Sequence, residues 1–264
     1  MDNGLIEKID RYRKERNAVI LAHNYTVGDV QDIADFVGDS LGLSRTAAGT
    51  DADVIVFCGV HFMAETAAIL VQDKRVIVPD IHAGCPMANM LTERQLVEFR
   101  SGHGDDSVVV TYVNSSAAIK AMSDICCTSE NAVSIVAQIP IEQAVLCVPD
   151  RNLGSYVSQQ LKRELVLWPG YCPTHHRLLP EVLLRTKEEH PEALVVVHPE
   201  CRPEVVALAD AVESTTGILR VCSESDRDEF IIGTEVGLLH RLQKENPGKC
   251  FYPAAPFMDC PNMK

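Results

Sequence analysis

The chain has 264 residues, of which 46% are hydrophobic and 23% charged, and its formal net charge is −13. This composition is typical of a soluble globular protein that can bury a large core. It contains no long basic run and no apolar run of ~20 residues, so we expect neither a nucleic-acid partner nor a membrane span. The polar N-terminus lacks the pattern of a signal peptide, which favours a cytoplasmic protein.

The first third of the chain predicts alternating helices and strands. An amphipathic helix is expected over residues 5–16, and the apolar run 18–22 predicts a buried strand. That strand leads into a polar triplet, His23, Asn24 and Tyr25. The expected elements that follow are a helix over residues 30–36, a strand over 54–57, a helix over 61–71 and a strand over 75–78.

The same order recurs twice. A strand over residues 108–111 leads into Tyr112 and Asn114, and a strand over 194–197 leads into His198 and Glu200. The other strands expected in these two copies cover residues 144–146, 165–167, 229–232 and 250–252, with helices over 155–163 and 235–244. Strands that alternate with helices predict parallel sheets covered on both faces.

Three cysteines, Cys85, Cys172 and Cys260, are each followed by proline, at spacings of 87 residues (172 − 85) and 88 residues (260 − 172). Equal spacing indicates a threefold internal repeat. The expected fold is therefore α/β, with three similar αβα domains around a pseudo-threefold axis. We place the domains at residues 1–88, 89–175 and 176–264.

Three equivalent thiolates that converge on one point would form a metal site. A set of three cysteines suits a [4Fe–4S] cluster with one open iron, which would act as a Lewis acid. Zinc with a fourth ligand is an alternative. Three structural cysteines that precede helix-starting prolines are another.

The polar triplets predict a pocket, because ligands of open α/β sheets bind beyond the carboxyl ends of the strands. Histidine and asparagine there could hold substrate carboxylates, while Tyr25 and Glu200 could move protons. Ser40, Ser129 and Thr215 recur with the same period, either as helix N-caps or as ligand contacts at helix N-termini.

Other histidines and cysteines near these motifs are also candidates for the site or for the core. His175 follows Cys172 closely and could touch a cluster or a substrate. Cys201 adjoins Glu200, and the remaining cysteines are expected to be core thiols. We expect His103, His176 and His240 at the surface and a simple turn over residues 150–154.

The chain resembles the quinolinate synthase family, the A proteins of de novo NAD biosynthesis, over essentially its whole length. The motifs that carry the resemblance cover residues 21–25, 38–40, 57–66, 84–88, 112–115, 149–154, 168–175, 198–201 and 258–263. The resemblance implies three αβα domains around a pseudo-threefold axis. It also implies a [4Fe–4S] cluster held by Cys85, Cys172 and Cys260.

The activity implied by the resemblance is condensation of iminoaspartate with dihydroxyacetone phosphate to give quinolinate, phosphate and water. Tyr25, Glu200 and His23 would be catalytic. The implied substrate contacts are His23, Ser40, Tyr112, Asn114, Ser129, His175, His198, Glu200 and Thr215. A transient contact with the enzyme that produces iminoaspartate is a further expectation, and no nucleic-acid or membrane partner is expected.

Two departures from the family pattern concern the third cysteine. Family members usually continue beyond this point, so a C-terminally shortened third domain is expected. Asn262 and Met263 follow Cys260 where some relatives carry extra cysteines. The alternatives are another three-domain [4Fe–4S] enzyme, of the isoprenoid-reductase or diphthamide type, and a non-enzymatic metal-stabilised binding protein.

Overall fold

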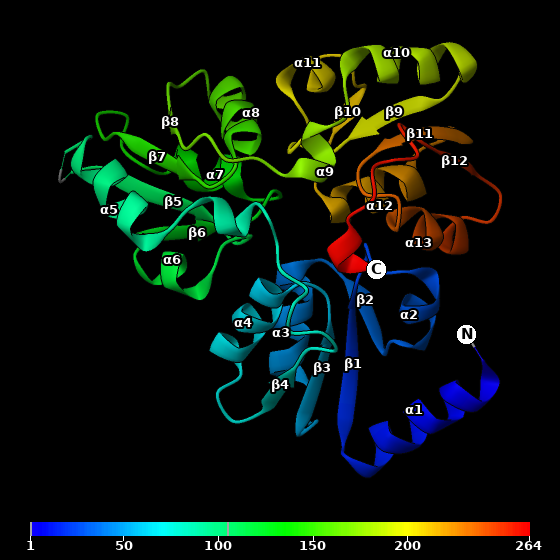
Figure 1. Ribbon diagram of the computed structural model, residues 1–264. Coiled ribbons are helices and arrows are strands. Elements are labelled where there is room, and N and C mark those ends of the chain that lie inside the picture. Colours follow the sequence, from blue (N-terminus) through cyan, green and yellow to red (C-terminus); the bar gives the residue numbers. More distant parts are fainter. Residues whose placement is uncertain (1, 105) are drawn as a thin grey trace. The chain divides into compact units, whose positions relative to one another are not determined.

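The computed structural model describes residues 2–104 and 106–264, and these residues form three parallel sheets of four strands (Figure 1). All three sheets have the same order, with the first strand between the second and the third: β2-β1-β3-β4, β6-β5-β7-β8 and β10-β9-β11-β12. The α/β class and the three similar units are confirmed. The arrangement about a threefold axis stays a prediction.

The central strand of each sheet is a run of apolar residues because helices cover both of its faces. These central strands are β1 (Ala18–His23), β5 (Val108–Tyr112) and β9 (Leu194–Val197). The other strands are β2 (Phe36–Gly38), β3 (Val54–Cys58), β4 (Arg75–Ile77), β6 (Ile125–Cys127), β7 (Val145–Val148), β8 (Val166–Leu167), β10 (Ala211–Val212), β11 (Glu229–Gly233) and β12 (Cys250–Pro253).

Helices connect the strands, as parallel pairing requires. In the first unit they are α1 (Asn3–Glu15), α2 (Gly28–Ile33), α3 (Ser40–Gly49) and α4 (His61–Leu70). The following helices are α5 (Glu93–Ser101), α6 (Ala117–Ala121), α7 (Ala132–Ala137), α8 (Arg151–Leu161) and α9 (Pro173–His176). The last are α10 (Pro180–Glu189), α11 (Pro203–Val206), α12 (Thr215–Glu224) and α13 (Leu238–Glu245). Short 3-10 turns cover Ala88–Met90 and Pro261–Met263.

Backbone contacts divide the chain into two compact units. The first contains the described residues through Cys85 together with Cys260–Lys264, and the second contains Pro86–Asp259. The first sheet belongs to the first unit and the other two sheets to the second. No helix of the described residues is long and apolar enough to cross a membrane.

An aspartate joins the central strand to the edge strand in every sheet. In the third sheet, the Asp210 carboxylate accepts a hydrogen bond from Val195 N–H at 2.8 Å, and Asp210 N–H donates to the Val195 carbonyl at 2.9 Å. Asp35 and Asp124 make the same pair of bonds in the other sheets. Each aspartate thus satisfies a backbone donor of the central strand that the short edge strand does not reach.

A recurrent hydroxyl residue follows each of these aspartates by five positions. These residues are Ser40, Ser129 and Thr215. The N-cap alternative is wrong for all three. Gly42 N–H donates to the side chain of the N-cap residue Asp39, and Gly217 N–H donates to that of the N-cap residue Ser214. Ser129 lies two residues before Asn131, which is the N-cap of α7. Ser40 and Thr215 are instead the first residues of α3 and α12.

Several expected elements differ from the observed ones. The helix expected over residues 30–36 covers Gly28–Ile33, and Phe36 begins the edge strand β2. The turn expected over residues 150–154 is wrong, because Asp150 is the N-cap and Arg151 the first residue of α8. In both cases a short polar segment carries no periodic pattern, and its conformation depends on hydrogen bonds to its neighbours.

Replacing the aspartate of one sheet tests this shared connection. Asp210→Ala leaves the buried Val195 N–H without its side-chain acceptor, so we expect a loss of about 1–3 kcal/mol in the free energy of unfolding. Urea unfolding followed by circular dichroism measures it. The exposed Asp226 provides the control Asp226→Ala, for which we expect less than about 0.5 kcal/mol. Equal free energies of unfolding for the two variants would show that the Asp210 connection does not stabilise the fold.

Candidate active site

The polar triplets form tight turns at the carboxyl ends of the central strands. In the first sheet, Tyr25 N–H donates to His23 Nδ1 at 3.2 Å, and in the third sheet Glu200 N–H donates to His198 Nδ1 at the same distance. Both histidines are buried. When neutral, each therefore carries its proton on Nε2.

Glu200 is a fully buried carboxylate, 2% exposed, at the centre of the second compact unit's polar site. Its Oε2 lies 2.7 Å from His175 Nδ1 and 3.9 Å from His198 Nδ1. Its Oε1 accepts a long hydrogen bond of 3.4 Å from Asn114 Nδ2, and the Tyr112 side chain also hydrogen-bonds to the carboxylate. The structure therefore brings together five of the predicted site residues of the second and third repeats.

The surroundings of Glu200 determine its ionisation. Burial alone would raise the pKa of this carboxyl group. The charges of His175 and His198, with hydrogen bonds from His175 and Tyr112, outweigh burial and lower the pKa to about 2. Glu200 is therefore ionised at neutral pH and accepts protons or hydrogen bonds.

Cys172 and His175 lie on one turn of the chain because Cys172 is the N-cap of α9 and Pro173 its first residue. His175 Nδ1 is 3.2 Å from Cys172 Sγ, and His175 Nε2 is 2.9 Å from the buried Thr234 hydroxyl. The His175 ring also stacks on His198, with ring centroids 4.8 Å apart. His175 is thus held beside both Cys172 and Glu200, and donor atoms of the three residues lie within 4.8 Å of one another.

Asp150 and Asn152, in the segment that was expected to form a turn, support this site. Asp150 accepts hydrogen bonds from the backbone N–H groups of Asn152 and Leu153 and, at 3.3 Å, from that of Cys172. Asn152 Nδ2 donates to the Glu200 carbonyl at 2.8 Å. The start of α8 therefore connects the loop of Cys172 to the loop of Glu200, which lie far apart in sequence.

The histidine next to His175 is not a surface residue as expected. His176 is half-buried, and its Nε2 accepts a hydrogen bond of 3.1 Å from Arg151. Burial, followed by the charges of Arg202 and Arg151, lowers the pKa of His176 to about 4, so it is neutral at physiological pH. Arg202 Nε donates to its carbonyl at 2.6 Å, which fixes the backbone beside His175.

The first compact unit contains His23, Tyr25, Ser40, Cys85 and Cys260. The rings of His23 and Tyr25 meet edge to face, with centroids 4.6 Å apart. A hydrogen bond of 2.6 Å from Asn262 Nδ2 to the Gly84 carbonyl connects the loop of Cys260 to the loop of Cys85. Two of the three cysteines followed by proline therefore lie on segments that are bonded to each other within this unit.

The other cysteines differ from these three in their surroundings. Burial raises the pKa of Cys58 to about 11 and that of Cys147 and Cys222 to about 12, and it also raises the pKa values of Cys127 and Cys201. Those thiols stay protonated, and the buried ones match the expected core role. Cys126 and Cys250 are exposed, so the core expectation is wrong for these two. Cys85, Cys172 and Cys260 are each half-buried, and none of the ten cysteines forms a disulfide.

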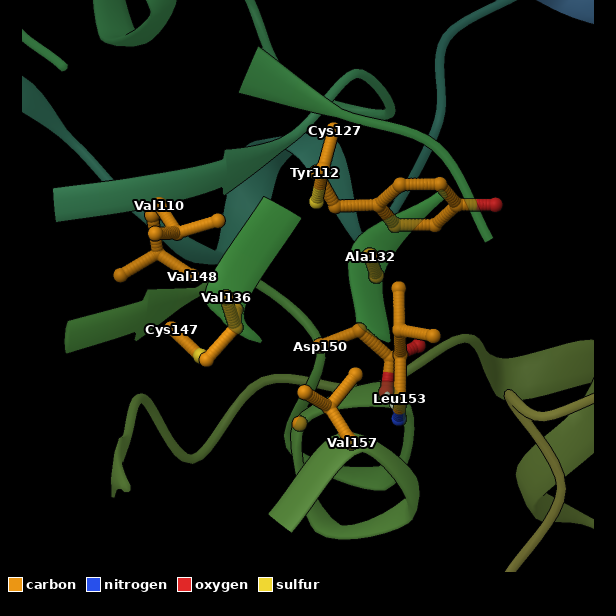
Figure 2. A pocket seen from close by; sticks show the side chains of 11 residues that line it. Val110, Tyr112, Cys127, Ala132, Val136, Cys147, Val148, Asp150, Leu153 and Val157 are labelled. Carbon is orange, nitrogen blue, oxygen red and sulfur yellow. Dashed lines mark hydrogen bonds between the residues drawn. The ribbon is translucent and has the colours of Figure 1, made fainter. Parts of the chain in front are cut away.

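An apolar cavity lies beside the second sheet, between the strands and the helices α7 and α8 (Figure 2). Its lining is mostly apolar and includes four valines, and Tyr112 and Asp150 are its only ionisable members besides two cysteines. Because Asp150 already accepts three backbone hydrogen bonds, the cavity lacks the polar groups that would orient a charged substrate. The polar site around Glu200 is the better candidate.

Asp150 gives this site a testable dependence on pH. Burial, and then the charge of Glu200, raises the pKa of Asp150 well above its ordinary value. A carboxyl group with a raised folded-state pKa stabilises the fold at low pH, and this stability is lost as pH rises above the unfolded-state value. We therefore expect Asp150→Asn to become more stable relative to the unmodified chain as pH rises above about 4, the unfolded-state pKa of aspartate.

Urea unfolding at several pH values measures this difference. The variant Asp150→Ala is the matched control, since it also removes the ionisable group but loses the N-cap, at a cost of about 1 kcal/mol. A stability difference between Asp150→Asn and the unmodified chain that stays constant with pH would contradict the raised pKa.

Comparison with known proteins identifies the family. Residues 7–264 match the family model described as "Quinolinate synthetase A protein". Similar proteins named "Quinolinate synthase" include one from Desulforudis audaxviator, 56% identical over 264 residues, which are 100% of this chain and 87% of the relative. Others come from Geotalea uraniireducens, at 58% over 95% and 82% of the two chains, and Methanosarcina barkeri, at 55% over 98% and 85%.

These matches exclude the isoprenoid-reductase and diphthamide-type alternatives and the non-enzymatic one. The similarity extends through every motif on which the sequence resemblance was based. The chain belongs to the quinolinate synthetase A protein family.

Proposed function

We propose that this chain is a quinolinate synthase that condenses iminoaspartate with dihydroxyacetone phosphate, releasing phosphate and water. Family membership supports the reaction, and one structural observation supports its location. That observation is the buried Glu200 carboxylate, held between His175 and His198 at the carboxyl end of a central strand. A buried carboxylate with histidine partners can accept protons where water is excluded.

The cofactor that we propose is a [4Fe–4S] cluster held by Cys85, Cys172 and Cys260. Their chemistry fits such a cluster, because they are half-buried thiols on loops, where a cluster can reach them. Fixed loops at Cys172, through Asp150, and at Cys85 and Cys260, through Asn262, support the same role. When bound, the cluster would supply a Lewis acid at an iron without a protein ligand.

We assign the remaining chemistry to the turns after the central strands. His23 and His198 donate Nε2–H to substrate oxygens, because their Nδ1 atoms already accept backbone hydrogen bonds. Glu200 accepts a proton from the condensing substrate, and Tyr25 transfers a proton at a separate step. Tyr112, Asn114 and His175 orient Glu200 and contact substrate.

Ser40, Ser129 and Thr215 are proposed to bind the phosphate or carboxylate groups. None of the three is the N-cap of the helix that follows it, because the N-caps are Asp39, Asn131 and Ser214. Backbone N–H groups at the starts of the helices would add further donors to an anion.

The same proposal covers the structural repeats, the substrates and the location of the protein in the cell. We propose three structural repeats at residues 1–88, 89–175 and 176–264, each contributing one cysteine and one polar turn. The substrates are small molecules, and we propose that the protein acts in the cytoplasm, with a transient contact to the enzyme that supplies iminoaspartate.

Cluster binding and turnover test the proposal together. We expect the anaerobically iron-loaded chain to form quinolinate from the two substrates and to show the broad visible absorbance of an iron–sulfur cluster. Cys85→Ala, Cys172→Ala and Cys260→Ala should each lose both properties. Cys126→Ala, which removes an exposed thiol, should retain both. Full cluster occupancy in any of the first three variants would exclude that cysteine as a ligand.

The proposed role of Tyr25 is tested separately from cluster binding. Tyr25→Phe removes only a hydroxyl group, so the cluster absorbance should persist while quinolinate formation falls by about 10²–10⁴-fold, the usual contribution of a proton-transfer group. Tyr12→Phe, at an exposed tyrosine of α1, is the matched control and should retain turnover. Turnover of Tyr25→Phe within a factor of about two of the control would rule out proton transfer by Tyr25.

A further inference from the structure

We propose that Cys172, His175 and Glu200 form a binding site for a single divalent ion of the Zn²⁺ or Co²⁺ class when the iron–sulfur cluster is absent. All three residues belong to the second compact unit, so the site is complete without Cys85 or Cys260. Only the competition with the cluster, described below, depends on the proposed function.

The distances between the donor atoms suit one small ion. His175 Nδ1 lies 3.2 Å from Cys172 Sγ and 2.7 Å from Glu200 Oε2, and all three donors lie within 4.8 Å of one another. Tetrahedral zinc with ordinary bond lengths separates sulfur, nitrogen and oxygen ligands by about 3.3–3.6 Å. Shifts on the order of 0.5–1 Å in these separations would therefore accommodate the ion.

The orientation of His175 is fixed by a residue outside the donor set. His175 Nε2 lies 2.9 Å from the hydroxyl of Thr234, which is buried. When an ion replaces the Nδ1 proton that His175 donates to Glu200, the remaining proton lies on Nε2 and can be donated to this hydroxyl. Metal-binding histidines are commonly oriented by such a bond at the second ring nitrogen.

Glu200 is also held in place before any ion binds. Asn114 approaches Oε1, while Asn152 bonds the main-chain carbonyl of the same residue. Oε2 is the oxygen that faces His175. A carboxylate fixed in this way loses little conformational freedom on binding an ion.

Charge favours a divalent ion at this position. A thiolate at Cys172 and the carboxylate of Glu200 would place two negative charges beside each other, and both Glu200 and His175 are almost fully buried. The histidines that face Glu200 compensate the charge of that carboxylate alone, so a thiolate at Cys172 would add a second negative charge without a partner. A divalent cation neutralises both charges, which burial otherwise makes costly.

The donor types select the class of ion. Thiolate and imidazole ligands suit zinc and cobalt, whereas magnesium and calcium prefer oxygen ligands alone. Three protein ligands leave a fourth position for water or a small anion. Because the proposed cluster also uses Cys172, the ion and the cluster exclude each other. Zinc at this site would hold the protein in a form that cannot take up iron.

Cobalt binding to the full-length Cys85→Ser variant tests the site. This variant lacks one proposed cluster ligand but keeps all three donors. After chelator treatment and under anaerobic conditions, we expect one Co²⁺ per chain, with a thiolate-to-cobalt charge-transfer band and the intense visible bands of tetrahedral coordination. Its dissociation constant is measured by titration, and displacement by Zn²⁺ gives the zinc affinity.

Variants in the Cys85→Ser background identify the ligands. His175→Ala and Glu200→Gln should weaken Co²⁺ binding at least about tenfold, and Thr234→Val about tenfold through the orientation of His175. Cys172→Ala should abolish the thiolate band. His103→Ala, at an exposed histidine, should leave binding unchanged. A thiolate band that survives Cys172→Ala, or unchanged affinity in both His175→Ala and Glu200→Gln, would overturn the site.

Competition is measured on the unmodified chain. Prior addition of one equivalent of Zn²⁺ should slow iron incorporation during anaerobic cluster assembly, and Glu200→Gln should relieve the inhibition. Undiminished iron uptake with zinc bound would overturn the mutual exclusion. Failure to take up iron even without zinc would instead overturn the proposed cluster, while the cobalt result would still stand.

Discussion

The buried carboxylate of Glu200 is the constraint around which the second compact unit's polar groups are arranged. An ionised group that is 2% exposed is tolerable only when hydrogen bonds and opposite charges replace the lost hydration. His175, His198 and Tyr112 provide these contacts, and Asn152 anchors the backbone of Glu200 from the start of α8. The same contacts place His175 beside Cys172. The residues that compensate the charge of Glu200 therefore also form the candidate active site.

The repeat determines where such a site can form. In each sheet the first strand lies between the second and the third, so the strand order reverses at the central strand, and ligands of open α/β sheets bind at the carboxyl ends of strands at such a point. The turns that begin at His23, Tyr112 and His198 occupy this position. Asp35, Asp124 and Asp210 then hold the edge strands to the central strands with equivalent bonds.

Much of the fold could be predicted from the sequence because buried parallel strands leave continuous apolar runs, and because the Cys-Pro spacing shows the repeat. The edge strands β2, β6 and β10 could not, since they contain two or three residues and depend on aspartate bonds rather than on an apolar pattern. At the site, the sequence indicated the cysteines and polar turns. It did not indicate Asn152 and Thr234, whose partners lie 48 and 59 residues away.

We propose that Cys85, Cys172 and Cys260 are the only protein ligands of the cluster, so that one of its irons is open to substrate. Mössbauer spectroscopy of the iron-loaded chain, before and after addition of substrate, tests this claim most directly. Because one iron lacks a cysteine, we predict that one of the four iron sites changes its isomer shift when substrate binds. Identical spectra with and without substrate, under conditions in which the substrate is bound, would contradict it.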